Sequence, residues 1–114
     1  MIKIEFTTND EKGRLSLKVK GHAGQATIGQ DIVCASASIL AYTVAQVVKD
    51  IESKGGLKKP PTIKLLKGDA CITCHPKEDY IDELAHTYYV ASVGYSLLAH
   101  NYPQYVDFNS FGKD

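Results

Sequence analysis

The sequence predicts an α+β fold, in which two long helices pack on a mostly antiparallel sheet of about five strands. Short segments in which apolar and polar side chains alternate open and close the chain, as expected for strands with one buried face. Two longer segments carry apolar residues at steps of three and four, as amphipathic helices do. The predicted order is strand, strand, helix, strand, strand, helix, strand, which favours helices layered on a sheet.

The first two strands are expected to form an antiparallel hairpin. Residues 2–7 alternate between apolar and polar side chains, and after a turn at 9–13 the alternation resumes over 15–20. The second strand ends beside Gly21 and His22. The end of a strand is a fixed place from which a side chain can be aimed at a site.

A loop and the first helix follow this hairpin. Gly24 and Gly29 lie in a segment, residues 23–30, that has few large apolar groups, and this predicts a mobile loop. Asp31 is a good N-cap residue, so we expect a helix from Ile32 to about Ser53. The apolar stripe of this helix consists of Val33, Ala37, Leu40, Val44, Val47, Val48 and Ile51.

A second hairpin and a second helix complete the predicted fold. Residues 62–74 form two short strands around a tight turn at 67–69. The second helix covers residues 76–100, because proline and acidic residues open it and a further proline follows its end. Residues 105–108 are expected to be a short last strand, and residues 110–114 a frayed tail.

Composition and charge predict one soluble domain spanning residues 1–114. The 44% apolar and 23% charged residues are ordinary for a globular protein, and 13 basic and 13 acidic residues give no net charge. We therefore expect no direct nucleic-acid contact. Residues 1–6 alternate and do not form an apolar leader, and Ile32–Val48 is too short and too polar to predict a membrane span. Three cysteines, an odd number, suggest reduced thiols and a cytoplasmic location.

Cys34 is the first candidate for chemistry. With Asp31 as N-cap, this cysteine lies in the first helical turn, where free backbone N–H groups and the helix dipole favour a thiolate. The same N–H groups are the expected donors to an oxyanion. A histidine such as His22 would complete a nucleophile and base pair. The alternative interpretations are a small core cysteine and a turn histidine that only finishes the strand.

Cys71-Ile72-Thr73-Cys74-His75 matches the C-x-x-C-H pattern of haem attachment. On the strand predicted here, Cys71 and Cys74 would point to opposite faces, so they could not hold one haem or one zinc ion together. We therefore expect neither a metal nor another cofactor.

The stretch around Cys34 resembles a known family. Gly21-His22-Ala23-Gly24, followed by Gly29-Gln30-Asp31-Ile32-Val33-Cys34-Ala35-Ser36-Ala37-Ser38, is similar to the signature of the bacterial ribosomal-processing cysteine protease (Prp) family. The pattern combines a histidine twelve residues before the cysteine with an aspartate three before it and a serine four after it. Length and element order fit as well, so the resemblance spans the chain.

The resemblance implies roles for individual residues. His22 matches the family's general base and Cys34 its nucleophile. Asp31 would orient His22 or line the substrate cleft, although helix capping explains it too. Ser38 would support the site by hydrogen bonding, although a small residue that permits close helix packing explains it equally well. The remaining motif residues, expected to bind substrate or support the site, are Gly21, Gly24, Gly29 and Ala35.

The resemblance also implies an activity: a cysteine endopeptidase that removes the short N-terminal extension of large-subunit ribosomal protein twenty-seven. Substrates of the family carry aromatic residues just before the cleaved bond, so an apolar cleft beside Cys34 is expected. The 23–30 loop would order on binding, and the protein would be a homodimer. Two alternatives stay open, a phage-type relative that trims capsid or scaffold proteins and a non-catalytic, peptide-binding ribosome assembly factor.

Overall fold

The computed structural model describes the backbone of residues 1–9, 13–21 and 28–113, and the side chains of these residues except 28–31 and 109–113. It confirms the predicted α+β class and element order, with one short 3-10 helix, η1, added before the second long helix. The elements are β1 (Ile2–Asn9), β2 (Arg14–Lys20), α1 (Ile28–Ser53), β3 (Thr62–Leu66), β4 (Asp69–Cys74), η1 (Glu78–Tyr80), α2 (Ile81–Asn101) and β5 (Val106–Lys113).

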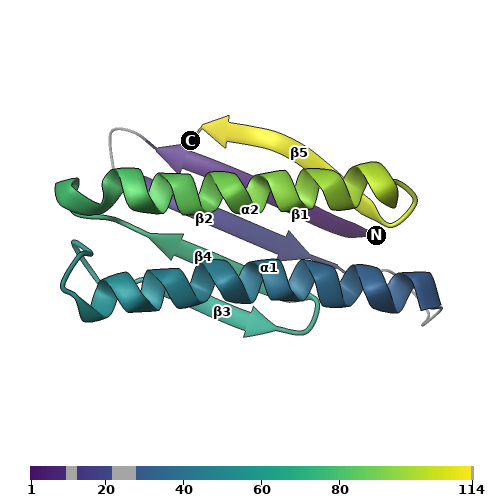
Figure 1. Cartoon of the computed structure of the whole chain (residues 1–114), viewed down its shortest axis with the longest axis horizontal. Helices are drawn as coiled ribbons and strands as arrows, with labels where there is room; N and C mark the ends of the chain where they lie inside the picture. Colours follow the sequence, from purple (N-terminus) through teal and green to yellow (C-terminus); the bar gives the residue numbers. More distant parts are fainter. Residues whose placement is uncertain (10–12, 22–27, 114) are drawn as a thin grey trace.

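The five strands form one sheet in the order β3-β4-β2-β1-β5. All neighbours are antiparallel except β1 and β5, which run parallel, so the sheet is mixed and mostly antiparallel as predicted. Both long helices lie on the same side of the sheet, with α2 over β1 and β2 and α1 beside β3 and β4 (Figure 1). The described residues therefore form two layers, and none of their helices lies on the other side of the sheet.

The core lies between the helices and the sheet. Phe6 of β1 is fully buried and meets Tyr88 and Tyr95 of α2 edge-on, with ring centroids 6.3 and 5.9 Å apart. Burial raises the pKa of both tyrosines. Each buried hydroxyl donates to a backbone carbonyl, Tyr88 to Ile72 at 3.0 Å and Tyr95 to Ala37 at 2.8 Å. These two hydrogen bonds tie α2 to the sheet and to α1.

Three predicted boundaries are wrong, and the first is the start of the second helix, which was expected at residue 76 but lies at Ile81, after η1. The tail was expected to fray, yet β5 continues to Lys113, because it pairs with β1 through partners such as Thr8 and Lys113. This pairing joins opposite ends of the chain, and no local pattern reveals it. α1 begins at Ile28, one turn before the predicted start, so Asp31 is its fourth residue and not its N-cap. An aspartate is also favourable within the first helical turn, so residue type alone could not choose between the two starts.

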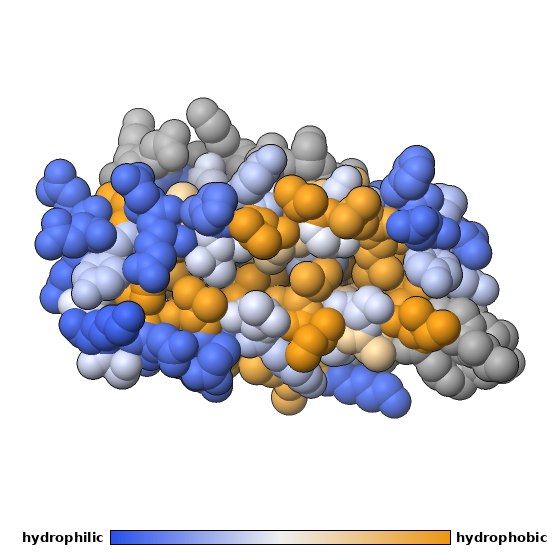
Figure 2. All heavy atoms as spheres, in the orientation of Figure 1, coloured by the Kyte–Doolittle hydropathy of each residue, from blue (hydrophilic) through white to orange (hydrophobic). Residues whose placement is uncertain are grey.

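The outer side of the helix pair carries exposed apolar side chains (Figure 2). The helices approach closely where Gly94 of α2 meets the Leu40 side chain of α1, since a Cβ at Gly94 would lie only 2.8 Å from it. Four side chains of this layer with more than 40% exposure define what we call the outer helix face: Ile39, Val90, Val93 and Leu97.

Ile32–Ser53 of α1 is long and apolar enough to cross a membrane by length and composition, within the part of the chain that the structure describes. The expectation that the apolar run at this position is too short and too polar is therefore not met. Val33, Val44 and Val48 of this helix are fully buried in the core. A core helix passes the same test, so the finding is weak evidence for a membrane span.

Candidate active site

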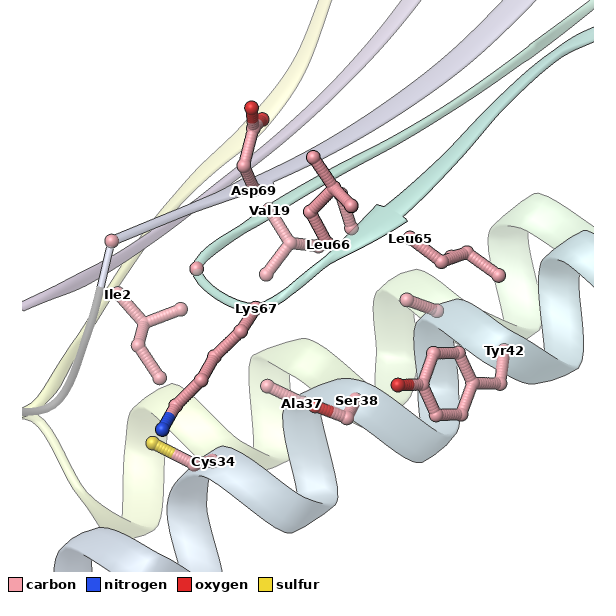
Figure 3. A pocket seen from close by; sticks show the side chains of 14 residues that line it. Ile2, Val19, Cys34, Ala37, Ser38, Tyr42, Leu65, Leu66, Lys67 and Asp69 are labelled. Carbon is pink, nitrogen blue, oxygen red and sulfur yellow. The ribbon is translucent and has the colours of Figure 1, made fainter. Parts of the chain in front are cut away.

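A cavity of about 330 Å³ lies between α1 and the hairpin of β3 and β4, with the sulfur of Cys34 at its wall (Figure 3). Most of the lining is apolar. The lining residues come from the start of β1, the end of β2, one side of α1 and the hairpin: Ile2, Val19, Gly21, Cys34, Ala37, Ser38, Ala41, Tyr42, Leu65, Leu66, Lys67, Gly68, Asp69 and Ala70.

Small side chains of α1 leave room for this cavity. Cys34, Ala37, Ser38 and Ala41 follow one another at steps of three and four, so they share one side of the helix. Ala37 and Ala41 are buried, Cys34 is half-buried, and Ser38 is exposed to solvent while also lining the cavity. The alanine and serine side chains after the cysteine are therefore short and leave space for the cavity.

Cys34 does not lie in the first turn of α1. The helix begins at Ile28, so Cys34 is its seventh residue, and its N–H is directed along the helix at the carbonyl of Gln30. The effect of the helix dipole falls off within the first turn. The expectation that Cys34 lies among the free N–H groups of the first turn is therefore wrong.

Gly21 occupies a position that only glycine fits. Its φ angle is 100°, and a Cβ there would collide with the backbone carbonyl of Met1. Its N–H donates a 2.9 Å hydrogen bond to the carbonyl of Gly68, in the turn between β3 and β4. Gly21 therefore joins the end of β2 to the hairpin tip, directly before the residue predicted as the base.

The other predicted site residues divide into three groups. His22 and Gly24 lie outside the described residues, and so does most of the loop predicted to close over the substrate. Gly29 and Asp31 belong to the first turn of α1. Ala35 is exposed to solvent and is not among the residues that line the cavity.

The hairpin tip contributes a residue that sequence reasoning missed. Lys67 lies in the turn between β3 and β4, lines the cavity, and points its ammonium group toward the Cys34 sulfur (Figure 3). The sequence shows a tight turn at this point and nothing that relates it to Cys34. Their proximity follows from the place of β3 and β4 in the sheet and from the position of α1 beside them.

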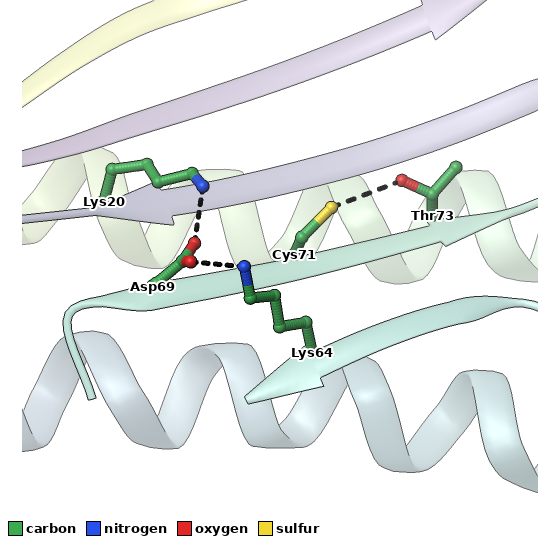
Figure 4. A network of polar contacts seen from close by, with 5 residues as sticks. All are labelled: Lys20, Lys64, Asp69, Cys71 and Thr73. Carbon is green, nitrogen blue, oxygen red and sulfur yellow. Dashed lines mark hydrogen bonds and ion pairs between the residues drawn. The ribbon is translucent and has the colours of Figure 1, made fainter. Parts of the chain in front are cut away.

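Ion pairs hold the turn between β3 and β4 on the side of the sheet that faces away from the helices. The carboxylate of Asp69 forms ion pairs of 2.5 Å with Lys20 of β2 and Lys64 of β3 (Figure 4). The hydrogen bonds from these two lysines lower the pKa of Asp69. Gly68, with φ of 74°, allows the chain to turn between Lys67 and Asp69. The Lys67 side chain therefore points toward the cavity, and the Asp69 side chain points away from it.

The two cysteines of β4 lie on opposite sides of the sheet, as predicted for a strand. Cys71 is half-buried on the outer side, with its sulfur 3.6 Å from the hydroxyl of Thr73 (Figure 4). Cys74 is buried in the core, 3.6 Å from the hydroxyl of Tyr88, and burial raises the pKa of its thiol. The C-x-x-C-H segment therefore does not present its two sulfurs to one ligand.

The family model of the cysteine protease Prp matches residues 1–107. The chain belongs to the Prp cysteine protease family. It is a cysteine protease, and Cys34 is the cysteine that borders the cavity. No curated protein sequence matches this member of the family.

Solved structures share the fold of this family member. Two are of the ribosomal processing protease Prp from S. aureus. The one with a covalently linked product peptide has a TM-score of 0.69 and 22% identity. The one with a substrate peptide has a TM-score of 0.70 and 21% identity, and each match covers 98% of this chain and 100% of the other. SMU.848 from Streptococcus mutans has a TM-score of 0.69 and 24% identity, covering 100% of this chain and 96% of the other.

Proposed function

We propose that this cysteine protease removes the short N-terminal extension of large-subunit ribosomal protein twenty-seven during ribosome maturation, in the cytoplasm. The observation that carries the proposal is the position of the Cys34 sulfur at the wall of a cavity of about 330 Å³. The S. aureus structures support a peptide ligand, since one holds a substrate peptide and the other a covalently linked product peptide.

The lining of the cavity suits the side chain expected before the cleaved bond. Val19 and Ala70 of the sheet are buried, Leu65 is half-buried, and Tyr42 of α1 lies at the exposed edge. An aromatic side chain placed among such groups removes apolar surface from water, which contributes about 25 cal/mol per Å². Recognition of an apolar residue next to Cys34 would also explain how an enzyme without net charge selects its peptide.

The proposed reaction uses Cys34 as nucleophile and His22 as general base. His22 accepts the thiol proton, and the sulfur attacks the carbonyl carbon of the scissile peptide bond. The tetrahedral intermediate collapses, the C–N bond breaks, and His22 returns the proton to the leaving amine. Water then hydrolyses the thioester and releases the acid product.

Cleavage of a fluorogenic peptide that carries the ribosomal-protein extension tests this function. We expect turnover by the wild type, and losses of at least about 1000-fold in Cys34→Ala and His22→Ala. Cys71→Ala is the matched control, because that cysteine lies on the other side of the sheet, and its activity should equal that of the wild type.

Other outcomes would identify other functions. Tight binding of the peptide without turnover in any variant would indicate a peptide-holding assembly factor. Neither binding nor turnover would exclude the ribosomal extension, and peptides from capsid or scaffold proteins would be assayed next.

We further propose that the protease is a homodimer in which a second copy covers the outer helix face. Val93 and Leu97 are four residues apart on α2 and are 43% and 59% exposed, and Ile39 on α1 is 60% exposed. A shallow apolar groove between the helices, lined by Leu40 and Val90 among others, continues this surface. A chain without net charge does not repel its copy, so burial of this face favours self-association.

A further inference from the structure

Attack by the Cys34 sulfur creates a negative charge that the backbone N–H of Cys34 does not face. The carbonyl oxygen of the substrate becomes an oxyanion when the S–C bond forms and the π electron pair moves to oxygen. Proteases with a nucleophile at a helix N-terminus use free N–H groups for this oxygen. Here the N–H of Cys34 is directed at the carbonyl of Gln30, within the helix.

We propose that Lys67 is a further catalytic residue, whose ammonium group donates a hydrogen bond to this oxyanion. The inference rests on the proposed attack of Cys34 on a peptide carbonyl. Lys67 lines the same cavity as Cys34 and points its nitrogen toward the sulfur (Figure 3). Because only the carbonyl carbon separates the oxyanion from the attacking sulfur, an ammonium group directed toward the sulfur is directed toward the oxyanion as well.

The fold holds the backbone of Lys67 in place from both sides. The Gly68 carbonyl accepts the N–H of Gly21 at 2.9 Å, and the Asp69 carboxylate is held by Lys20 and Lys64. A fixed backbone limits the region that the exposed Lys67 side chain can sample, and a donor that starts near its target reorganises less in the transition state.

The charge of Lys67 is available for this role. Asp69, the next carboxylate along the chain, is turned to the opposite side and paired with Lys20 and Lys64 (Figure 4). Within the described residues, Lys67 forms no ion pair of its own. The remaining lining near Cys34, such as Ile2 and Ala37, is apolar and buried, so it does not compete for the ammonium group.

Steady-state kinetics with the ribosomal-extension peptide test the proposal. We expect Lys67→Met to lower kcat about 100-fold with KM within about threefold, as loss of one oxyanion donor does. Lys67→Arg keeps a cationic donor and should retain most of kcat. Lys49→Met is the matched control, because that lysine is exposed on α1 and is not among the residues that line the cavity, and its kcat should equal that of the wild type. An unchanged kcat in Lys67→Met, or a raised KM alone, overturns the proposal.

A second readout needs no peptidase activity. Alkylation of Cys34, followed by peptide mass spectrometry, compares anionic iodoacetate with neutral iodoacetamide. The ratio of the two rates reports the positive charge near the sulfur, and it should fall about fivefold in Lys67→Met but not in Lys49→Met. If the wild type cleaves no peptide, the proposed function fails, and this ratio alone decides whether Lys67 supplies charge to the site. An unchanged ratio would then overturn the inference.

Discussion

The hydroxyl of Tyr95 donates a 2.8 Å hydrogen bond to the carbonyl of Ala37. Tyr95 is a fully buried residue of α2, and Ala37 lines the cavity three residues after Cys34 on α1. The bond therefore fixes one helix against the other directly behind the candidate active site.

Replacing Tyr95 by phenylalanine removes this hydrogen bond and keeps the ring. The carbonyl of Ala37 retains its helical partner, so we expect the free energy of unfolding to fall by about 1 kcal/mol. Urea denaturation measures the change. Tyr89→Phe is the control, because that side chain is 56% exposed, and its stability should stay within about 0.5 kcal/mol of the wild type. Equal stabilities of the two variants would show that the Tyr95 hydrogen bond contributes nothing.

Gly21→Ala should destabilise the fold strongly. The φ angle of 100° strains any residue with a Cβ, and the new methyl group would also collide with the carbonyl of Met1. We expect a loss of roughly 3 kcal/mol in the free energy of unfolding. Gly55→Ala separates the two effects, since Gly55 has φ of 77° but no atom within 4 Å of a Cβ, and it should lose only about 1 kcal/mol. Similar losses in both variants would remove the Met1 carbonyl from the explanation.

His75 should titrate below its ordinary value of 6.5. Burial lowers the pKa of this histidine first, and the charges of Lys59, Arg14 and Lys58 lower it further. The unfolded chain therefore binds more protons than the fold, and the stability contributed by neutral His75 is lost as the pH falls from 6.5 through the folded value. An NMR titration of the ring proton measures the midpoint.

Lys59→Gln should raise this midpoint toward 6.5. Lys3→Gln removes a lysine that does not act on His75 and is the control. A midpoint that moves equally in both variants would indicate a general charge effect and not the local one described.

Dimer formation should depend on the outer helix face. Val93→Glu combined with Leu97→Glu places two carboxylates on this face, and their burial between copies would be costly. Light scattering should give the mass of a dimer for the wild type and 12.5 kDa for the variant. Thr62→Glu adds charge to an exposed position on β3 and should leave the dimer intact. A wild type that is already monomeric would disprove the proposed dimer.

Local patterns predicted most of this fold, since alternation and helical spacing report which side of an element is buried. Phe6 and Leu17 are fully buried, as alternation requires. The same reasoning placed Cys71 and Cys74 on opposite sides of β4, which the structure confirms. What local patterns could not supply is pairing between distant segments, including the strand order and the extension of β5 to Lys113.

Local patterns likewise predicted one part of the candidate site and not the other. Cys34 could be found from its motif, and the small residues after it explain one wall of the cavity. Lys67 could not be predicted from the sequence, because Lys67 and Cys34 line the same cavity only when β4 pairs with β2 and α1 lies against the hairpin. The helix start was mistaken because an aspartate favours both a cap and a first turn, and the position of Cys34 in the first turn was mistaken with it.

The parallel pairing of β1 with β5 has a consequence for the order of assembly. Among the described strands, β1 is made before the others, and one of its two edges finds its partner only in β5. Until β5 emerges, that edge keeps its N–H and C=O groups unpaired, and closing so large a loop is slow. During that interval the open edge of β1 can pair with a strand of another chain, so misassembly is favoured until β5 joins the sheet.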